Sequence, residues 1–217
     1  MSSTIGIIGG TGPAGRGVAV RLALAGFDVA IGSRDAQRAA EVVQGMGTSA
    51  TGSIRGAANE DASSADIVIV ATPWDSAIAT VKPLRDQLSG KVVISMVNAL
   101  VREGRELVPL IAPRGSMAAQ LAATLPTSRI VGAFHHLPAA QMEDLESGLD
   151  ADVVVVGDDP RALGTVAEIV DQMLGLRAVI AGSLSLAGAV ESFTAVCISI
   201  NIRHKVHSYV KLEGFSL

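Results

Sequence analysis

Residues 5–15 read Ile5-Gly6-Ile7-Ile8-Gly9-Gly10-Thr11-Gly12-Pro13-Ala14-Gly15, an apolar run that passes directly into a glycine-rich loop. Within it, Gly10, Gly12 and Gly15 have the spacing G-x-G-x-x-G. Between a strand and a helix this spacing predicts a dinucleotide-binding turn: the first glycine permits the turn, the second lets a pyrophosphate approach, and the third lets the helix lie close to the sheet. The alternative is a glycine-rich turn without a ligand.

The end of the next apolar run indicates which dinucleotide is bound. Residues 29–32 are followed by Ser33 and Arg34, whereas an NAD site usually has Asp or Glu at this point to bind the ribose hydroxyls. The guanidinium of Arg34 suits a phosphate dianion, and Arg38 lies one helical turn further on. The pattern favours NADP(H) over NAD(H). The alternative is that both arginines form a solvated face and that Asp35 caps the following helix.

The rest of the chain predicts an α/β fold, a Rossmann-type doubly wound and mostly parallel sheet with a small helical C-terminal domain. Continuous apolar runs are typical of parallel strands buried on both faces, and they occur at 5–9, 29–32, 67–71, 92–96, 130–134, 153–156 and 178–180. Helical segments are expected at 16–25, 36–43, 76–88, 116–125 and 160–174. Residues 1–182 would form the dinucleotide-binding domain, and 183–217 would cap its cleft or form a subunit interface.

Composition excludes several other classes of protein. The 217 residues carry a net charge of −4 and only 3% aromatic residues, so the chain lacks the basic field and stacking side chains of a nucleic-acid binder. A single cysteine excludes an intrachain disulfide framework and a thiolate zinc site, and no His/Cys cluster has metal-ligand spacing. We also expect no membrane span, no signal peptide and a reducing, cytoplasmic location.

Three predicted strands end in unusual residues. The strand at 67–71 is followed by Trp74, the strand at 92–96 ends in the stretch 95–98, which carries small polar groups, and the strand at 130–134 is followed by His135 and His136. Ligands of open parallel sheets bind beyond such strand ends, although Trp74 could simply pack at a helix start and the histidines could be structural. No nucleophile–base pair is visible. Hydride transfer needs none, because the cofactor supplies the chemistry.

These features together resemble one family, the NADPH-dependent F420 reductases, also called F420:NADP oxidoreductases. The resemblance extends over essentially the whole chain. It depends on 8–12, 32–34, 59–62, Pro73-Trp74, His135 with 137–140, 157–159, and 190–192 with the basic segment after it.

The resemblance implies hydride transfer between NADP(H) and the deazaflavin coenzyme F420, in a homodimer. By position, Thr11, Gly12, Pro13 and Ala14 would hold the pyrophosphate, and Ser33, Arg34 and Arg38 the 2′-phosphate, with Arg38 standing where the family has Lys. The residues on the nicotinamide side would be Trp74, Ile78, Leu100 and Ala139. Those facing the deazaflavin would be His135, Leu137 and Pro138, with His135 as a positioning group.

Two other functions remain open. One is an NADPH-dependent reductase of a small imine or carbonyl, although such enzymes usually have a far longer helical substrate domain. The other is a non-catalytic NADP(H)-sensing regulator, which would need a partner surface. The basic cluster of the tail is the candidate for that surface, or it could simply balance a helix C-terminus; its members are Arg203, His204, Lys205, His207 and Lys211.

Overall fold

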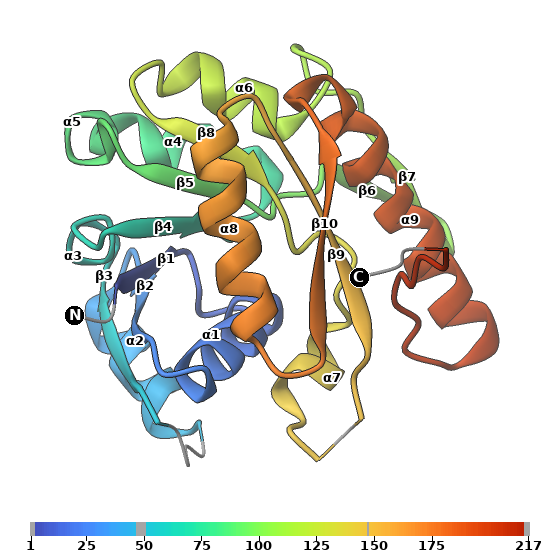
Figure 1. Cartoon of the computed structure of the whole chain (residues 1–217), viewed down its shortest axis with the longest axis horizontal. Helices are drawn as coiled ribbons and strands as arrows, with labels where there is room; N and C mark the ends of the chain where they lie inside the picture. The colour runs from blue at the N-terminus through green and yellow to red at the C-terminus, as the bar shows by residue number, and fades with distance from the viewer. Residues whose placement is uncertain (1–2, 47–50, 147, 215–217) are drawn as a thin grey trace.

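A computed structural model describes residues 3–46, 51–146 and 148–214, and it contains an eight-stranded sheet flanked by helices (Figure 1). In spatial order the strands are β10 (Leu176–Gly182), β9 (Ala151–Gly157), β8 (Arg129–Gly132), β5 (Val92–Ser95), β4 (Ile67–Val70), β1 (Thr4–Ile8), β2 (Asp28–Ser33) and β3 (Ser53–Ala58). The predicted Rossmann-type, mostly parallel sheet is confirmed. Strands β2 and β3 extend the sheet on one side of β1, whereas β4 and β5 extend it on the other. Ligands of such folds bind at this point, where the order of the strands reverses between β1 and β4.

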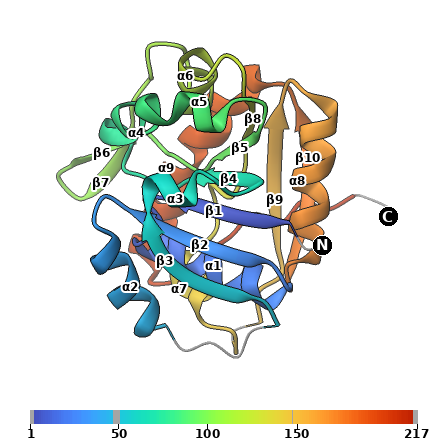
Figure 2. The same ribbon diagram turned by 90° about the vertical axis from the view of Figure 1, so that its left-hand side faces the viewer.

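The sheet differs from the prediction in the direction of two strands, and the structure contains three strands that were not predicted. Strand β9 pairs with β8 in antiparallel fashion, so β9 and β10 run against the other six strands although they are parallel to each other. Strand β3 was not predicted, because it lies at the sheet edge and alternates in burial, whereas the prediction relied on continuous apolar runs. A separate antiparallel hairpin, β6 (Leu100–Glu103) with β7 (Glu106–Pro109), was also not foreseen (Figure 2).

The helices cover both faces of the sheet. They are α1 (Pro13–Leu24), α2 (Ala36–Gln44), α3 (Asn59–Ala62), α4 (Trp74–Val81), α5 (Arg85–Leu88), α6 (Met117–Thr124), α7 (Ala139–Glu143), α8 (Pro160–Gln172) and α9 (Ala187–His204). The helix expected over 76–88 is instead α4, a 3₁₀ turn η1 (Lys82–Leu84) and α5. Pro83 lies within η1, and a proline interrupts an α-helix because it has no N–H to donate.

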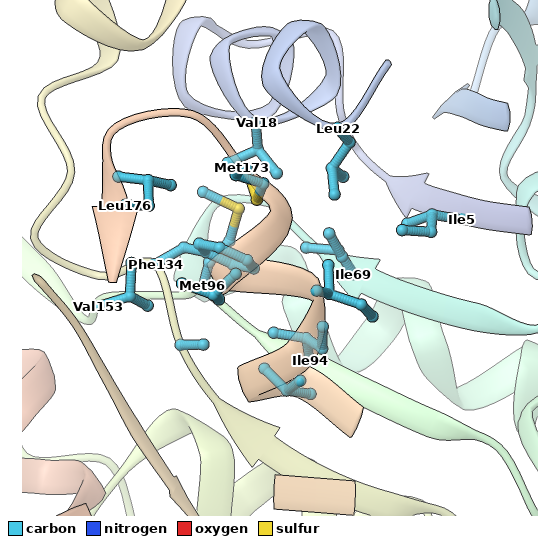
Figure 3. Close-up of a cluster of buried hydrophobic side chains, with 14 of the residues drawn as sticks. Ile5, Val18, Leu22, Ile69, Ile94, Met96, Phe134, Val153, Met173 and Leu176 are labelled. Atoms are coloured by element: carbon cyan, nitrogen blue, oxygen red, sulfur yellow. The ribbon is translucent and has the colours of Figure 1, made fainter. Parts of the chain in front are cut away.

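Alternate residues of the buried strands build two apolar layers. On one face, Ile5, Ile69 and Ile94 pack against α1 and α8, a cluster drawn in Figure 3. On the other, Val68 and Val93 pack against α4 to α6. A parallel strand buried on both faces needs an apolar side chain at every position. The continuous Val/Ile runs therefore follow from the position of these strands between two helix layers.

Helix α9 packs beside α6 and β7, following the 3₁₀ turn η2 (Leu184–Leu186) (Figure 1). It ends at His204, its C-cap Lys205 has a left-handed backbone, and residues 206–214 then return along β9. There the Asp152 N–H donates to the Val210 carbonyl at 2.8 Å, and the Leu212 N–H donates to the Asp152 carboxylate at 2.6 Å. The proposed domain boundary at 182/183 stays a prediction.

One part of the described chain, Leu184–His204, is long and apolar enough to cross a membrane by length and composition alone, a test that a helix of a soluble protein can also pass. The expectation of no membrane span stays a prediction. Only 28% of its most apolar window is buried in the fold. Its exposed apolar side chains include Phe193, Val196, Ile200 and Ile202. Among the residues that the structure describes, nothing covers this apolar surface of the helix.

Candidate functional site

A cleft of about 560 Å³ opens at the carboxyl ends of β1, β2, β4 and β5. Its size lies within the range of about 300–1,000 Å³ that is common for ligand pockets. It brings together the glycine loop, the end of β2 and the ends of two neighbouring strands. Its lining includes Gly9, Thr11, Gly12, Pro13, Ala14, Gly15, Ser33, Arg34, Arg38, Asn59, Thr72, Trp74, Met96, Val97 and Asn98.

The glycine loop has three different requirements for glycine. Gly9 has the left-handed φ of +70° that the turn needs, a role the sequence analysis gave to Gly10. A Cβ on Gly15 would lie 2.6 Å from the backbone of Gly10, so these two residues are in contact. A Cβ on Gly12 would meet nothing within 4 Å. Gly12 thus borders open space in the cleft, where a pyrophosphate would need room.

The N-terminus of α1 faces the same cleft. Gly12 is its N-cap, Pro13 opens the helix, and no described side chain caps it. No acidic residue lies in the first turn. Unpaired N–H groups and the positive end of the helix dipole favour an anion at this point.

At the end of β2, two arginines line the cleft. Arg34 and Arg38 are exposed, and in the described parts of the chain neither has an ion pair. Asp35 accepts from the N–H groups of Gln37 at 2.9 Å and Arg38 at 3.2 Å, so it caps α2, as the alternative interpretation held. The cap leaves both guanidinium groups available to a phosphate.

The residues assigned to the nicotinamide side do not all lie in this cleft. Trp74, 37% exposed at the start of α4, lines it and also an adjoining apolar hollow of about 420 Å³. Ile78 lines only that hollow, and Leu100 belongs to β6 and lines neither space. Ala139 opens α7, which packs on α1. Leu137 and Pro138 directly precede it and also lie outside both linings.

His135 is buried behind the cleft wall. Its Nδ1 lies 3.0 Å from Oδ1 of Asn98, and the Asn98 amide donates to the His135 carbonyl at 3.3 Å. This amide orientation makes Nδ1 the protonated nitrogen, so Nε2, which has no hydrogen-bond partner among the described residues, can only accept. Burial, with His136 nearby, lowers the pKa of His135 to about 3. The ring is therefore neutral near pH 7.

His136 has a structural partner. Its Nε2 lies 2.7 Å from the Val190 carbonyl, and Phe193 packs edge-on against the ring at 5.5 Å between centroids. Burial lowers the pKa of His136, opposed by that hydrogen bond. The ring is turned toward α9, which is the structural interpretation considered for this residue.

Three buried polar residues have partners that the sequence did not indicate. The Oδ1 of Asn59 accepts the Gly9 N–H at 3.1 Å and so supports the loop. Thr194 on α9 donates toward the Asn98 Oδ1 and the His135 carbonyl, each at 3.2 Å. Glu191 accepts from the Met117 and Ala118 N–H groups at the start of α6, at 2.8 and 2.9 Å. Asn59 and Glu191 lie in the quoted motifs, but nothing local revealed their partners.

The protonation of Glu191 is set by its position. Burial raises the pKa of Glu191 to about 7, although the two N–H groups of α6 favour its charged form. Val190, Glu191 and Thr194 together attach one turn of α9 to His136, to the start of α6 and to the Asn98–His135 pair. The helix therefore covers the wall behind the cleft.

Comparison with known proteins agrees with this geometry. Residues 4–99 match the family model described as NADP oxidoreductase coenzyme F420-dependent. The chain is 35% identical over 214 residues to an F420-dependent NADP reductase of Methanocaldococcus jannaschii, covering 93% of each chain. A solved structure of a putative F420-dependent NADP reductase from Arthrobacter sp. FB24 is 23% identical, covers 96% of this chain and 97% of its own, and superposes with a TM-score of 0.80. The chain belongs to the family of F420-dependent NADP reductases.

A more distant solved structure shows the same fold in a longer protein. The pyrroline-5-carboxylate reductase of Coxiella burnetii is 18% identical and superposes with a TM-score of 0.58. The match covers 83% of this chain but only 60% of that one.

Two glycine substitutions separate binding from folding in the loop. We predict that Gly12→Val folds normally, because a Cβ there meets nothing, but no longer binds NADPH. Thermal melts with and without NADPH measure this: a saturating ligand at about 100 times Kd adds about 2.7 kcal/mol to the wild type and nothing to the variant. Gly15→Ala should instead lower stability without ligand by about 1–3 kcal/mol, through overpacking against Gly10. A normal NADPH shift in Gly12→Val would contradict the placement of the pyrophosphate.

Proposed function

We propose that this protein transfers a hydride between NADP(H) and coenzyme F420. The observation that carries the proposal is the cleft itself, in which the open face of Gly12, the uncapped start of α1 and the two arginines after β2 lie together. The name of the M. jannaschii relative supplies the second substrate. The decisive test is turnover of F420 with NADPH, followed by the absorbance of the deazaflavin.

The order of groups along the cleft sets the orientation of the dinucleotide. With the 2′-phosphate at Arg34 and Arg38 and the pyrophosphate at the start of α1, the nicotinamide would lie by the ends of β4 and β5. That is the end of the cleft where Trp74, Met96 and Asn98 lie. Asn98 connects this end to His135, and thus to the segment 135–138 proposed to face the deazaflavin.

The protein's contribution to the chemistry would be position and exclusion of water. Hydride leaves the nicotinamide carbon of NADPH and is accepted by a carbon of the deazaflavin, whose ring nitrogen then takes a proton from water. Asn98 and Thr194 hold the His135 segment through its carbonyl and ring. Because this ring is neutral and Nε2 carries no proton, His135 would position the deazaflavin and not protonate it.

The two alternatives are less well supported. The match to the pyrroline-5-carboxylate reductase covers only 60% of that protein, so a large part of it has no counterpart in the match. For a sensing regulator, the basic cluster would be the partner surface. Lys211 of that cluster forms an ion pair with Asp150 and helps to fix the tail, which favours a structural role for it.

The arginine after β2 should determine the choice of nucleotide. We predict that Arg34→Ala weakens NADPH binding about 10- to 150-fold, because a charge-assisted hydrogen bond to phosphate is worth about 1.5–3 kcal/mol, and leaves NADH binding unchanged. Titration with both nucleotides measures the ratio. Arg161→Ala, on the exposed side of α8, is the matched control and should change neither. An NADPH/NADH ratio equal to that of the wild type would rule out the assignment.

The buried state of His135 predicts that this residue contributes no limb to the pH profile near neutral pH. Since its pKa is lowered to about 3, kcat should show no histidine limb between about pH 5.5 and 8, where an ordinary histidine with a pKa of about 6.5 would titrate. His135→Gln should raise the KM for F420 by up to about 100-fold and leave NADPH affinity intact. His204→Gln, at the exposed end of α9, should behave as wild type. A kcat limb near pH 6.5 that disappears in His135→Gln would assign it acid catalysis instead.

The exposed stripe of α9 supports the homodimer that is part of this proposal. Phe193, Val196 and Ile200 are spaced along one side of the helix and are 46, 46 and 40% exposed. Two copies of this surface could meet across a two-fold axis. We predict that Val196→Glu with Ile200→Glu gives a monomer in sedimentation velocity, whereas Leu174→Glu, an exposed apolar residue at the end of α8, does not. A dimer that survives the double substitution would place the interface elsewhere.

The remaining parts of the proposal concern location and domains. The one cysteine, Cys197, is free and buried, which suits a reducing cytoplasmic location. Residues 1–182 would bind the dinucleotide, and 183–217 would cover the cleft wall and supply the subunit interface.

A further inference from the structure

The short helix α7 is attached to α1 in three places. Gly17 lies so close to it that a Cβ there would be 2.5 Å from the Cβ of Met142. The buried Arg21 donates to the Gln141 carbonyl at 2.7 Å and to the Asp144 carbonyl at 3.3 Å. The third contact is an ion pair between Arg16 and Glu143. Helix α7 therefore moves with the helix that begins at the glycine loop.

Arg16 differs from the other two contacts because it also binds the loop. Its Nε donates to Oε1 of Glu143 at 2.8 Å, and its Nη1 donates to the Thr11 carbonyl at 3.2 Å. Across residues 3–46, 51–146 and 148–214 it is the one side chain whose hydrogen bonds reach both the loop and α7. Gly17 and Arg21 still hold α7 in place without it.

The bond to the Thr11 carbonyl also orients a donor of the cleft. The Thr11 C=O and the Gly12 N–H belong to one planar trans peptide, so they point in opposite directions. Arg16 holds the carbonyl on the α7 side of the loop, which turns the Gly12 N–H away from that side. A pyrophosphate that uses this N–H stabilises the same peptide orientation that Arg16 selects.

The contact between Arg16 and Glu143 joins the glycine loop to α7, and α7 follows directly after the segment 135–138 that is proposed to face F420. Glu143 is the last residue of α7, and Pro138 is its N-cap, directly after Leu137. A shift of α7 would therefore be transmitted to the residues proposed to face the deazaflavin. The path from Thr11 to Pro138 consists of two hydrogen bonds and one short helix.

We infer that Arg16 is a positioning residue that couples NADP(H) binding at the glycine loop to F420 binding at residues 135–138. The inference rests on the proposed function, because it presumes that both substrates bind. Its consequence is positive coupling: each substrate tightens the binding of the other by the same factor. The competing view is a partly exposed ion pair of little energetic weight, since the side chains of Arg16 and Glu143 are 29 and 35% exposed.

Binding of the two oxidised substrates tests the inference without turnover. Oxidised F420 is titrated by its fluorescence against the full-length protein, with and without saturating NADP⁺, and no hydride can pass between them. For the wild type we expect NADP⁺ to tighten F420 binding about 5-fold or more. Arg16→Gln should reduce this factor toward 1. Glu143→Gln should do the same while NADP⁺ affinity is kept, because the bond from Arg16 to Thr11 remains.

A matched arginine elsewhere in the fold is the control. Arg129 also pairs with a carboxylate, Asp159 at 3.6 Å, and donates to the Gly90 carbonyl at 3.1 Å, but it touches neither the loop nor α7. Arg129→Gln should keep the wild-type coupling factor, and melting temperatures should show that all variants are folded. Coupling unchanged in Arg16→Gln, or equally lost in Arg129→Gln, would overturn the inference. A wild type that binds F420 without coupling would do so too, whereas no F420 binding at all would overturn the proposed function.

Discussion

The contact between Gly10 and Gly15 is the constraint on which the site depends. With no room for a side chain between them, the first turn of α1 lies directly against the loop that leaves β1. This places the start of the helix, with its unpaired N–H groups, at the carboxyl end of the sheet. Asn59 accepts a hydrogen bond from the Gly9 N–H and so helps to hold the loop in place. The two arginines after β2 and the strand ends of β4 and β5 then complete one cleft around it.

A second set of contacts supports the wall behind the cleft. One turn of α9 reaches His136, α6 and the Asn98–His135 pair through Val190, Glu191 and Thr194. Each contact satisfies a buried polar group that would otherwise cost free energy. The C-terminal helix is therefore part of the wall that holds the proposed deazaflavin segment. Its other side remains apolar and exposed, which makes it suitable for a second copy of the chain.

The features predicted from sequence are those with a local signal. The strand, loop and helix of residues 5–24 follow one another in the chain, and parallel strands necessarily bring residues 33–38, 72–74 and 96–98 to one edge. The partners of His135 and Glu191 lie 37 and 74 residues away, so no local pattern could reveal them. The strand β9 was predicted, but its antiparallel orientation was not, because a buried strand has the same apolar pattern in either direction. Ile78 and Leu100, assigned by resemblance alone, lie outside the main cleft.

The central claim is direct hydride transfer between two substrates held together in this cleft. A single turnover with NADPH carrying deuterium at C4 of the nicotinamide tests it most directly, with mass spectrometry of the reduced F420. The account predicts that reduction in ordinary water yields F420 with deuterium at carbon when the transferred face is labelled. Reduced F420 whose new carbon-bound hydrogen comes from solvent with either face labelled, or no reduction by NADPH, would contradict it.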